Sequence, residues 1–525
     1  MGRLASVAVG VACCLEAASV SAAQAPTSAG CDALITLQVP GVALSVVKAE
    51  WHPAGSPPPP PGPGGRGFTG TLPSYCRLDG VIDRRTSADG KSYGIGFALA
   101  LPAEWNGRVL LQGGGGLNGS VHAPLGAAAA GSTPALARGF AVVSTDTGHT
   151  GQGGFDASFM RDQQASLDFA YQAVGRVAVI AKQIVAQHYA RPANRSYFAG
   201  CSTGGREGML MVQRYPTYFD GVVVGAPAMR TDVSGIADEW VAVMLNQVAP
   251  TDDAGRPITR QALSDADKRT VIDGILNACD ASDGVNDGMV FNTSACRFDP
   301  KTLVCNGPKK DGCLTMAQAS ALEKAFAGPK DSKGRQVYPG FLYDTGIAAT
   351  QGIPGLLQGG LNPVGPAFTA KEMDVDRRAE AASSNPQAIL SATSTWTNLN
   401  TFSSHGGKLV FYHGVSDPWF SALDTIDYYE RMSKANGGAS EVANWSRLFL
   451  APGMGHCGGG EAALDSFDLL GAVVDWVENG KAPDAVVATG RTLPGRSRPL
   501  CPYPQYAHFT GQGDSQDARN FVCRE

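Results

Sequence analysis

One serine in this sequence stands in a setting that suits nucleophilic catalysis. Residues 200–204 read Gly-Cys-Ser-Thr-Gly and match the pattern G-x-S-x-G around Ser202. The apolar segment 197–199 before the match is typical of a strand, and the segment 206–215 after it has a helical pattern. A strand, a sharp turn and a helix in this order expose the serine hydroxyl above a sheet. We therefore predict that Ser202 is a nucleophile.

A serine hydroxyl needs a base to take its proton and a carboxylate to orient that base. Asp417 follows the apolar segment 409–412, and His456 follows the segment 447–450. Both segments are predicted strands, and sites in parallel sheets assemble at the carboxyl ends of strands. The chain order serine, aspartate, histidine is a known order of catalytic triads. We predict Asp417 as the acid and His456 as the base; His149 and His413 are the alternatives for the base.

A glycine run supplies candidates for binding an oxyanion. Residues 113–116 are all glycine and follow the predicted strand 109–111. Glycines let backbone N–H groups approach a developing negative charge, and the residue after the nucleophile supplies a second donor. We predict the N–H groups of Gly114 and Thr203. A flexible turn is the alternative, and a dinucleotide-binding loop is disfavoured because no helix-opening G-x-G-x-x-G follows.

Two cysteines flank the predicted nucleophile and base. Cys201 precedes Ser202, and Cys457 follows His456. If the serine and the histidine are in contact, their neighbours are close enough for a disulfide. A free catalytic thiol at Cys201 is the alternative, which an oxidising compartment disfavours.

The elements around these residues alternate between strands and helices. Strands are predicted at 93–101, 108–111, 140–145, 196–199, 221–224, 408–412 and 447–450, and helices at 166–188, 423–433 and 463–477. This alternation favours an α/β fold with a mostly parallel sheet that helices cover on both faces. The pattern is interrupted between about 229 and 399, which predicts an inserted second domain.

Composition and the first residues indicate the compartment. The net charge of −5 excludes a basic nucleic-acid binder. The 12 cysteines point to an oxidising compartment. Residues 1–23 have the charged start, apolar stretch and small residues of a signal peptide, and no later segment is apolar enough to span a membrane. We expect a secreted or periplasmic protein; removing the signal peptide removes Cys13 and Cys14 and leaves an even number of cysteines.

Residues 200–205, Asp417 and the pair His456-Cys457 together resemble the tannase/feruloyl esterase family, which is marked by a disulfide between the neighbours of its serine and histidine. The resemblance implies an α/β-hydrolase core over 24–228 and 400–525, with a lid domain over 229–399. It also implies five disulfides, which are Cys201–Cys457, Cys31–Cys76, Cys279–Cys296, Cys305–Cys313 and Cys501–Cys523.

An acidic loop in the predicted lid has the composition of a calcium site. Residues 280–289 contain three aspartates around glycines, and such hard oxygen ligands suit Ca²⁺ better than Zn²⁺. From composition alone, a simple Asp/Gly turn is the alternative. The family resemblance implies a structural calcium, and no organic cofactor is expected. Its ligands would be the side chains of Asp280, Asp283 and Asp287 and the carbonyls of Val285 and Met289.

The resemblance implies a serine carboxylic-ester hydrolase whose small-molecule substrates are esters of hydroxycinnamic or hydroxybenzoic acids. Hydrolysis of terephthalate monoesters is the alternative within the family, and the lack of arginine between Arg335 and Arg377 disfavours it. A non-catalytic, calcium-binding secreted module and a serine peptidase are the alternatives outside that activity. The sequence leaves the oligomeric state open.

Overall fold

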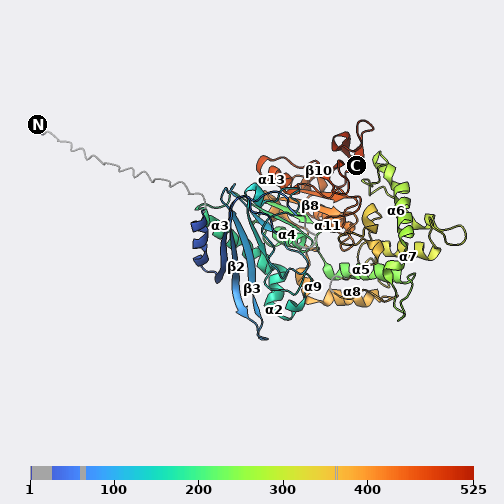
Figure 1. Ribbon diagram of the computed structural model, residues 1–525, viewed down its shortest axis with the longest axis horizontal. Helices are drawn as coiled ribbons and strands as arrows, with labels where there is room; N and C mark the ends of the chain where they lie inside the picture. Colours follow the sequence, from blue (N-terminus) through green and yellow to red (C-terminus); the bar gives the residue numbers. More distant parts are fainter. Residues whose placement is uncertain (1, 3–26, 60–66, 361, 363–364) are drawn as a thin grey trace.

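The computed structural model describes residues 2, 27–59, 67–360, 362 and 365–525, and its largest element is one sheet (Figure 1). The sheet has nine strands in the order β1-β2-β3-β5-β4-β6-β7-β8-β9. Neighbours from β1 to β5 in this order pair antiparallel, and those from β5 to β9 pair parallel. The strands are β1 (Leu44–His52), β2 (Tyr75–Thr86), β3 (Ser92–Pro102), β4 (Arg108–Gln112), β5 (Ala141–Thr145), β6 (Arg195–Cys201), β7 (Gly221–Gly225), β8 (Lys408–Gly414) and β9 (Ser446–Ala451).

Helices cover both faces of this sheet because successive side chains of a strand point to opposite faces. Phe198 of β6 joins the apolar cluster of α3 (Ala173–His188), α4 (Thr203–Gln213) and α11 (Ala422–Ala435). Tyr197, its neighbour, joins the opposite cluster with α13 (Leu469–Asn479). Two small sheets, β10–β11 and β12–β13, contribute to that second cluster. Their strands are β10 (Val486–Thr489), β11 (Ser497–Leu500), β12 (Tyr506–Phe509) and β13 (Phe521–Arg524). The α/β fold class is therefore confirmed.

Two predicted helices differ from the structure for local reasons. The helix expected at 166–188 is interrupted by a π-helical turn, Asp168–Gln172, between α2 (Gln163–Leu167) and α3. The helix expected from residue 463 begins only at Leu469, because Asp468 accepts a hydrogen bond from the Gly471 N–H and caps it. The other short helices outside the predicted lid are α1 (Ser28–Asp32), α10 (Asn400–Ser404) and α12 (Ala439–Val442).

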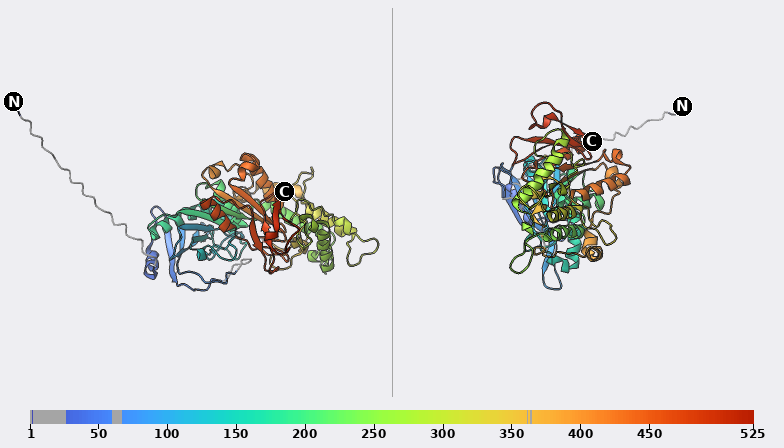
Figure 2. Two further views of the ribbon diagram at one scale, coloured as in Figure 1. Left: turned by 90° about the horizontal axis from the view of Figure 1, so that it is seen from above. Right: turned by 90° about the vertical axis from the view of Figure 1, so that its right-hand side faces the viewer.

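The predicted lid lies at one end of an elongated molecule, and β2 and β3 lie at the other (Figures 1 and 2). Its described residues contribute no strand to the nine-stranded sheet. They form a separate apolar cluster that includes Leu245, Ile275 and Leu322. The limits 229–399 stay a prediction. The lid helices are α5 (Thr231–Asn246), α6 (Asp265–Cys279), α7 (Met316–Ala327), α8 (Val375–Ser384) and α9 (Pro386–Ser391).

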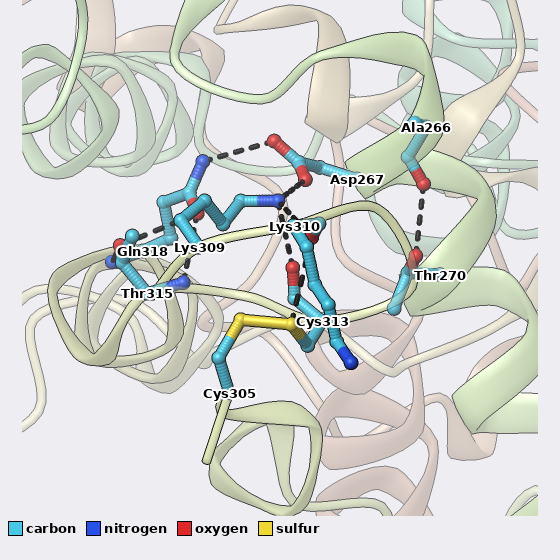
Figure 3. Close-up of a disulfide and its surroundings, with 9 residues drawn as sticks. All are labelled: Ala266, Asp267, Thr270, Cys305, Lys309, Lys310, Cys313, Thr315 and Gln318. Atoms are coloured by element: carbon cyan, nitrogen blue, oxygen red, sulfur yellow. Dashed lines mark hydrogen bonds and ion pairs between the residues drawn. A yellow bond between two sulfur atoms is a disulfide. The ribbon is translucent and has the colours of Figure 1, made fainter. Parts of the chain in front are cut away.

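A small disulfide loop, Cys305–Cys313, is anchored to the lid helices by a lysine (Figure 3). Lys309 Nζ lies 2.6 Å from Asp267 Oδ1 near the start of α6 and donates to the Cys313 carbonyl at 2.7 Å. The other carboxylate oxygen of Asp267 accepts from Gln318 Nε2 of α7 at 3.0 Å. One carboxylate thus connects the loop to two helices.

Ten cysteines form five disulfides in the structure. They are the pairs that the family resemblance implies: Cys31–Cys76, Cys201–Cys457, Cys279–Cys296, Cys305–Cys313 and Cys501–Cys523. The predicted signal peptide, residues 1–23, lies outside the described residues apart from Gly2 and stays a prediction. Among the described residues, no helix is both long and apolar enough to cross a bilayer.

Candidate active site

Ser202 lies at the sharp turn between β6 and α4. Its backbone has φ 64° and ψ −125°, a conformation that is strained for a residue with a side chain. The Ser202 N–H donates to the Gly225 carbonyl at 3.0 Å, and its carbonyl accepts from the Arg206 N–H at 2.9 Å. A Cβ on Gly204 would lie 2.7 Å from the Gly114 carbonyl oxygen, so the turn needs glycine there. The structure thus has the strand–turn–helix that the sequence predicts.

Asp417 and His456 lie side by side, after β8 and β9. His456 Nδ1 is 2.7 Å from Asp417 Oδ2. Asp417 Oδ1 accepts from the N–H groups of Trp419 at 2.9 Å and Phe420 at 3.1 Å. Burial raises the pKa of Asp417, but the charges and hydrogen bonds of His456 and His413 outweigh burial and hold this pKa well below its usual range. The carboxylate therefore stays ionised and can orient the imidazole.

A disulfide joins the turn that carries the serine to the loop that carries the histidine. The Cα atoms of Cys201 and Cys457 are 5.9 Å apart. Because each cysteine is the chain neighbour of Ser202 or His456, the disulfide holds these two residues in one small region. His456 Nε2 is buried and has no hydrogen-bond partner in the part of the chain that the structure describes, so it is available for proton transfer. The disulfide leaves no free thiol at Cys201.

The two other histidines considered as the base are engaged elsewhere. His413 Nδ1 is 2.8 Å from Thr425 Oγ1, and its Nε2 is 2.8 Å from the Phe420 carbonyl. The same Nε2 lies 3.3 Å from Asp417 Oδ2, so His413 supports the acid rather than competing with His456. His149 is buried against Phe159 with ring centroids 3.8 Å apart, and burial lowers its pKa to about 4.

The glycine loop after β4 lies against the start of α4. The Gly204 N–H donates to the Gly114 carbonyl at 3.1 Å, and the Thr203 hydroxyl donates to the Gly116 carbonyl. Thr203 is the first residue of α4, where helix N–H groups lack an intrahelical acceptor. Its N–H has no acceptor among the described residues. The N–H of Thr203 therefore stays a candidate donor to the oxyanion, as the sequence predicts.

The N–H of Gly114 does not fit its predicted role. It donates to Glu207 Oε2 at 2.9 Å, and Glu207 Oε1 accepts from Asn118 Nδ2 at 2.6 Å. Glu207 is fully buried, and an N–H already held by a buried carboxylate is not available to an oxyanion. The next N–H of the loop, that of Gly115, has no acceptor within the described chain and replaces Gly114 as the candidate.

Aromatic side chains border His456, and the sequence reasoning missed them. The rings of Trp419 and Phe420 lie 4.9 Å and 5.2 Å from the imidazole, centroid to centroid. Phe155, from the segment after β5, meets Trp419 edge-on at 5.9 Å and is 37% exposed. The available signal was the position of Trp419 and Phe420 directly after Asp417-Pro418. An aromatic edge beside the base suits a flat, apolar substrate group.

The acidic loop after α6 brings its carboxylates close together. Asp280 accepts from the N–H groups of Asp287 at 3.1 Å and Gly288 at 2.9 Å, and Asp283 accepts from Phe291 at 3.0 Å. Burial, opposed by the Phe291 N–H and reinforced by the charges of Asp287 and Asp280, raises the pKa of Asp283 to about 7. The loop therefore holds more negative charge than its own hydrogen bonds stabilise.

The observations on a cation at the same loop point in two directions. Asp287 Oδ1 is buried and has no hydrogen-bond partner in the described chain, while its Oδ2 pairs with the buried Arg498. A carboxylate oxygen without a donor, beside a carboxylate with a raised pKa, suits a calcium ion. No set of three or more His, Cys, Asp and Glu residues in the described ranges has the arrangement of a metal site. Calcium at this loop stays a prediction, as do the carbonyl ligands of Val285 and Met289.

The mostly parallel sheet, the serine turn and the aspartate–histidine pair define an α/β hydrolase. The profile of the family described as "Tannase and feruloyl esterase" matches residues 76–365 and 366–524. The chain belongs to this family, and it is an ester hydrolase. The family resemblance seen in the sequence is therefore confirmed.

Individual relatives agree with this membership. A mono(2-hydroxyethyl) terephthalate hydrolase from Piscinibacter sakaiensis is 39% identical, with 86% of this chain and 85% of that protein covered. A probable feruloyl esterase from Arthroderma benhamiae is 30% identical, with 81% of each chain covered. The crystal structure of feruloyl esterase B from Aspergillus oryzae superimposes with a TM-score of 0.76 at 27% identity, covering 95% of this chain and 100% of that one.

Proposed function

We propose that the protein is a serine esterase that cleaves esters of aromatic carboxylic acids through an acyl-enzyme. Ser202 Oγ attacks the ester carbonyl carbon while His456 Nε2 takes the hydroxyl proton. The N–H groups of Thr203 and Gly115 donate to the oxyanion that forms. Asp417 holds the imidazolium through Nδ1. His456 then gives the proton to the leaving alcohol as the carbon–oxygen bond breaks.

The second half of the reaction releases the acid. Water attacks the acyl carbon while His456 Nε2 accepts one of its protons, and the same N–H groups hold the second oxyanion. The bond to Ser202 Oγ breaks, and His456 returns the proton to this oxygen. Free carboxylic acid leaves and the hydroxyl is restored.

The main support for the proposal is that the acid contacts the base, and that a disulfide joins the loop of the base to the turn of the nucleophile. Asp417 Oδ2 lies 2.7 Å from His456 Nδ1, and the disulfide next to His456 leads to Cys201, the neighbour of Ser202. The other ring nitrogen of His456, Nε2, has no hydrogen-bond partner among the described residues. A decayed, non-catalytic calcium-binding module would not need this arrangement, so that alternative is disfavoured.

Replacing the nucleophile tests the reaction type. The Ser202→Ala variant should lose turnover of an activated ester by roughly 10⁶-fold while keeping its melting temperature, because serine and histidine act as one unit. It should also fail to react with a fluorophosphonate, which labels the wild-type protein. Ser383→Ala, at an exposed lid serine, is the matched control and should change neither readout. Retained turnover by Ser202→Ala would contradict the proposal.

Two observations support an aromatic acid as the acyl part of the substrate ester. The side chains of Trp419, Phe420 and Phe155 lie beside the base, and the relatives have named activities on such esters. Relative kcat/KM on methyl ferulate, methyl gallate and mono(2-hydroxyethyl) terephthalate separates the branches. We expect the hydroxycinnamate or the hydroxybenzoate ester to be preferred, since the lid has no arginine between Arg335 and Arg377 for a second carboxylate. The relative that hydrolyses the terephthalate ester, at 39% identity, keeps that substrate as the second candidate. A higher kcat/KM on mono(2-hydroxyethyl) terephthalate than on the other two esters would select this second candidate.

Two further parts of the proposal concern stability and location. We propose a structural calcium held by Asp280, Asp283 and Asp287 with the carbonyls of Val285 and Met289; bound there, the ion would neutralise the carboxylates of the loop.

We also propose a secreted or periplasmic location, because the five disulfides are typical of oxidising compartments and residues 1–23 have the pattern of a signal peptide. Sequencing the amino terminus of the exported protein tests the second point.

A further inference from the structure

A buried carboxylate of the lid contacts both loops that carry the acid and the base. Asp344 is fully buried. Its Oδ2 accepts a hydrogen bond from Ser416 Oγ at 2.7 Å and from the Gly453 N–H at 2.6 Å. Ser416 is the residue before Asp417, and Gly453 lies three residues before His456. One oxygen atom therefore connects the two loops.

The packing around this oxygen is tight. A Cβ on Gly346, two residues after Asp344, would lie 2.3 Å from the Gly453 carbonyl oxygen and 2.7 Å from Ser416 Oγ. The Ser416 N–H also donates to the Met454 carbonyl at 3.0 Å, so the two loops are paired directly as well. Such close contacts leave the lid segment at Asp344 little freedom to move independently of the two loops.

We propose that Asp344 is a positioning residue for the catalytic triad: its carboxylate sets the distance between the Asp417 loop and the His456 loop by holding Ser416 and Gly453 together. The inference rests on the proposed function. Asp344 touches neither the substrate nor the triad, and it acts through the neighbours of Asp417 and His456. The lid thus takes part in building the site and does not merely lie beside it.

The expected effect follows from how strongly catalysis depends on geometry. A misplacement of a catalytic group by about 1 Å can cost about 100-fold in rate. Asparagine in place of Asp344 would keep one side-chain oxygen that can accept both bonds, because Oδ2 alone accepts them and Oδ1 has no partner among the described residues. Alanine removes this oxygen, so the bond to Ser416 and the bond to Gly453 are both lost.

The first experiment compares Asp344→Ala with the wild-type full-length protein. We expect kcat for an aromatic ester to fall by roughly 10- to 100-fold with KM nearly unchanged, and fluorophosphonate labelling of Ser202 to slow in parallel. The matched control is Asp376→Ala. Asp376 also accepts from a serine hydroxyl and a backbone N–H, those of Ser332, at 3.0 Å and 2.9 Å, but at an exposed place in the lid. This control should leave kcat unchanged.

The second experiment separates positioning from a general loss of stability. Combined with Asp417→Asn, the Asp344→Ala change should cost little further activity, because the triad that Asp344 positions is already disabled. A structural role would instead multiply the two losses. Ser416→Ala, which removes one of the two donors, provides a milder test if Asp344→Ala does not fold, and it should also lower kcat with KM unchanged.

Several outcomes would overturn the inference. These are an unchanged kcat in Asp344→Ala, an unchanged kcat in Ser416→Ala, or multiplying losses in the double variant. Each counts only against a wild-type protein that hydrolyses the ester. A wild-type protein without ester hydrolysis would instead contradict the proposed function, so the two failures are distinguishable.

Discussion

Asp417 of the active site and Asp283 of the lid loop are both buried carboxylates, and their surroundings shift their pKa values in opposite directions. Asp417 has two imidazoles beside it, and although burial opposes them, its pKa lies well below the usual range. Asp283 is flanked by other carboxylates, and burial raises its pKa to about 7. The surroundings of Asp417 thus favour its ionised form, whereas the surroundings of Asp283 disfavour it.

The groups that surround the two carboxylates account for this difference. The histidines at Asp417 come from the chain itself, so the acid and base are assembled by folding and by the Cys201–Cys457 disulfide. At the lid loop, the chain supplies two arginines: Arg498 of β11 pairs with the Asp287 carboxylate, and Arg496 donates to the Asp287 carbonyl at 2.8 Å. A cation from solution would complete the balance. The predictions below test this contrast, beginning with the largest effect.

The largest effect is expected at Asp417. Asp417→Asn should lower kcat by about 10⁴-fold, because the amide no longer fixes the tautomer of His456 or stabilises its positive charge. Steady-state kinetics on an activated ester measures the loss, and far-ultraviolet circular dichroism checks that the fold is retained. Asp283→Asn is the comparison variant and should leave kcat close to wild type. A loss below about tenfold for Asp417→Asn would contradict its role as the orienting acid.

The second effect concerns Arg498, which is fully buried beside Asp287. Arg498→Met fills a similar volume but leaves the Asp287 carboxylate without its cation, and breaking such a buried pair costs about 3–5 kcal/mol of unfolding free energy. Denaturant unfolding measures this loss, and added calcium should recover part of it.

The control for that experiment is Arg519→Gln, which breaks an ion pair with Asp517 at an exposed position. Solvent screens such pairs, so little change in stability is expected. If Arg498→Met unfolds at the same denaturant concentration as this control, the pair with Asp287 does not stabilise the loop.

The smallest effect is a pH dependence of the calcium-free protein. The folded state raises the pKa of Asp283 from 3.8 to about 7, so it disfavours the ionised form. The contribution of Asp283 to the free energy of unfolding is therefore fully present below about pH 4, and it is lost as the pH rises through about 7. In the presence of a chelator, the free energy of unfolding should decline between about pH 4 and pH 7. Saturating calcium should remove this decline, because the ion binds the ionised carboxylate.

Asp283→Asn is the matched variant for this measurement. Its unfolding free energy in chelator should lose the part of the pH dependence that Asp283 causes. Turnover measured immediately after chelation should stay near the starting value, since the loop is structural. A decline that calcium leaves untouched would contradict the proposed ion, and an immediate loss of turnover would contradict a purely structural role.

The parts of the site that the sequence revealed are those with local signals. Ser202 is marked by its neighbours in the chain, and Asp417 and His456 are marked by the strands before them. The fold class follows from the alternation of apolar segments, whereas the start of α13 at Leu469 depends on capping by Asp468, which the apolar spacing does not show. Such signals depend on a few adjacent residues, which is why they can be read without a structure.

The parts that sequence reasoning missed depend on contacts between distant segments. Gly114 and Gly115 look alike in the glycine run, and the hydrogen bond from Gly114 to Glu207, 93 residues away, decides which N–H is free. Asp344 meets Ser416 and Gly453 across 72 and 109 residues. The π-helical turn at Asp168–Gln172 likewise has no local mark in a segment whose apolar residues have helical spacing.

The Cys201–Cys457 disulfide spans 256 residues of chain, and the whole lid lies inside this interval. A single protease cut anywhere in the lid would therefore yield a two-chain molecule, not two separate pieces. The fragments would migrate apart on a gel only after reduction. Limited proteolysis can thus open the lid backbone while the serine turn and the histidine loop remain covalently joined.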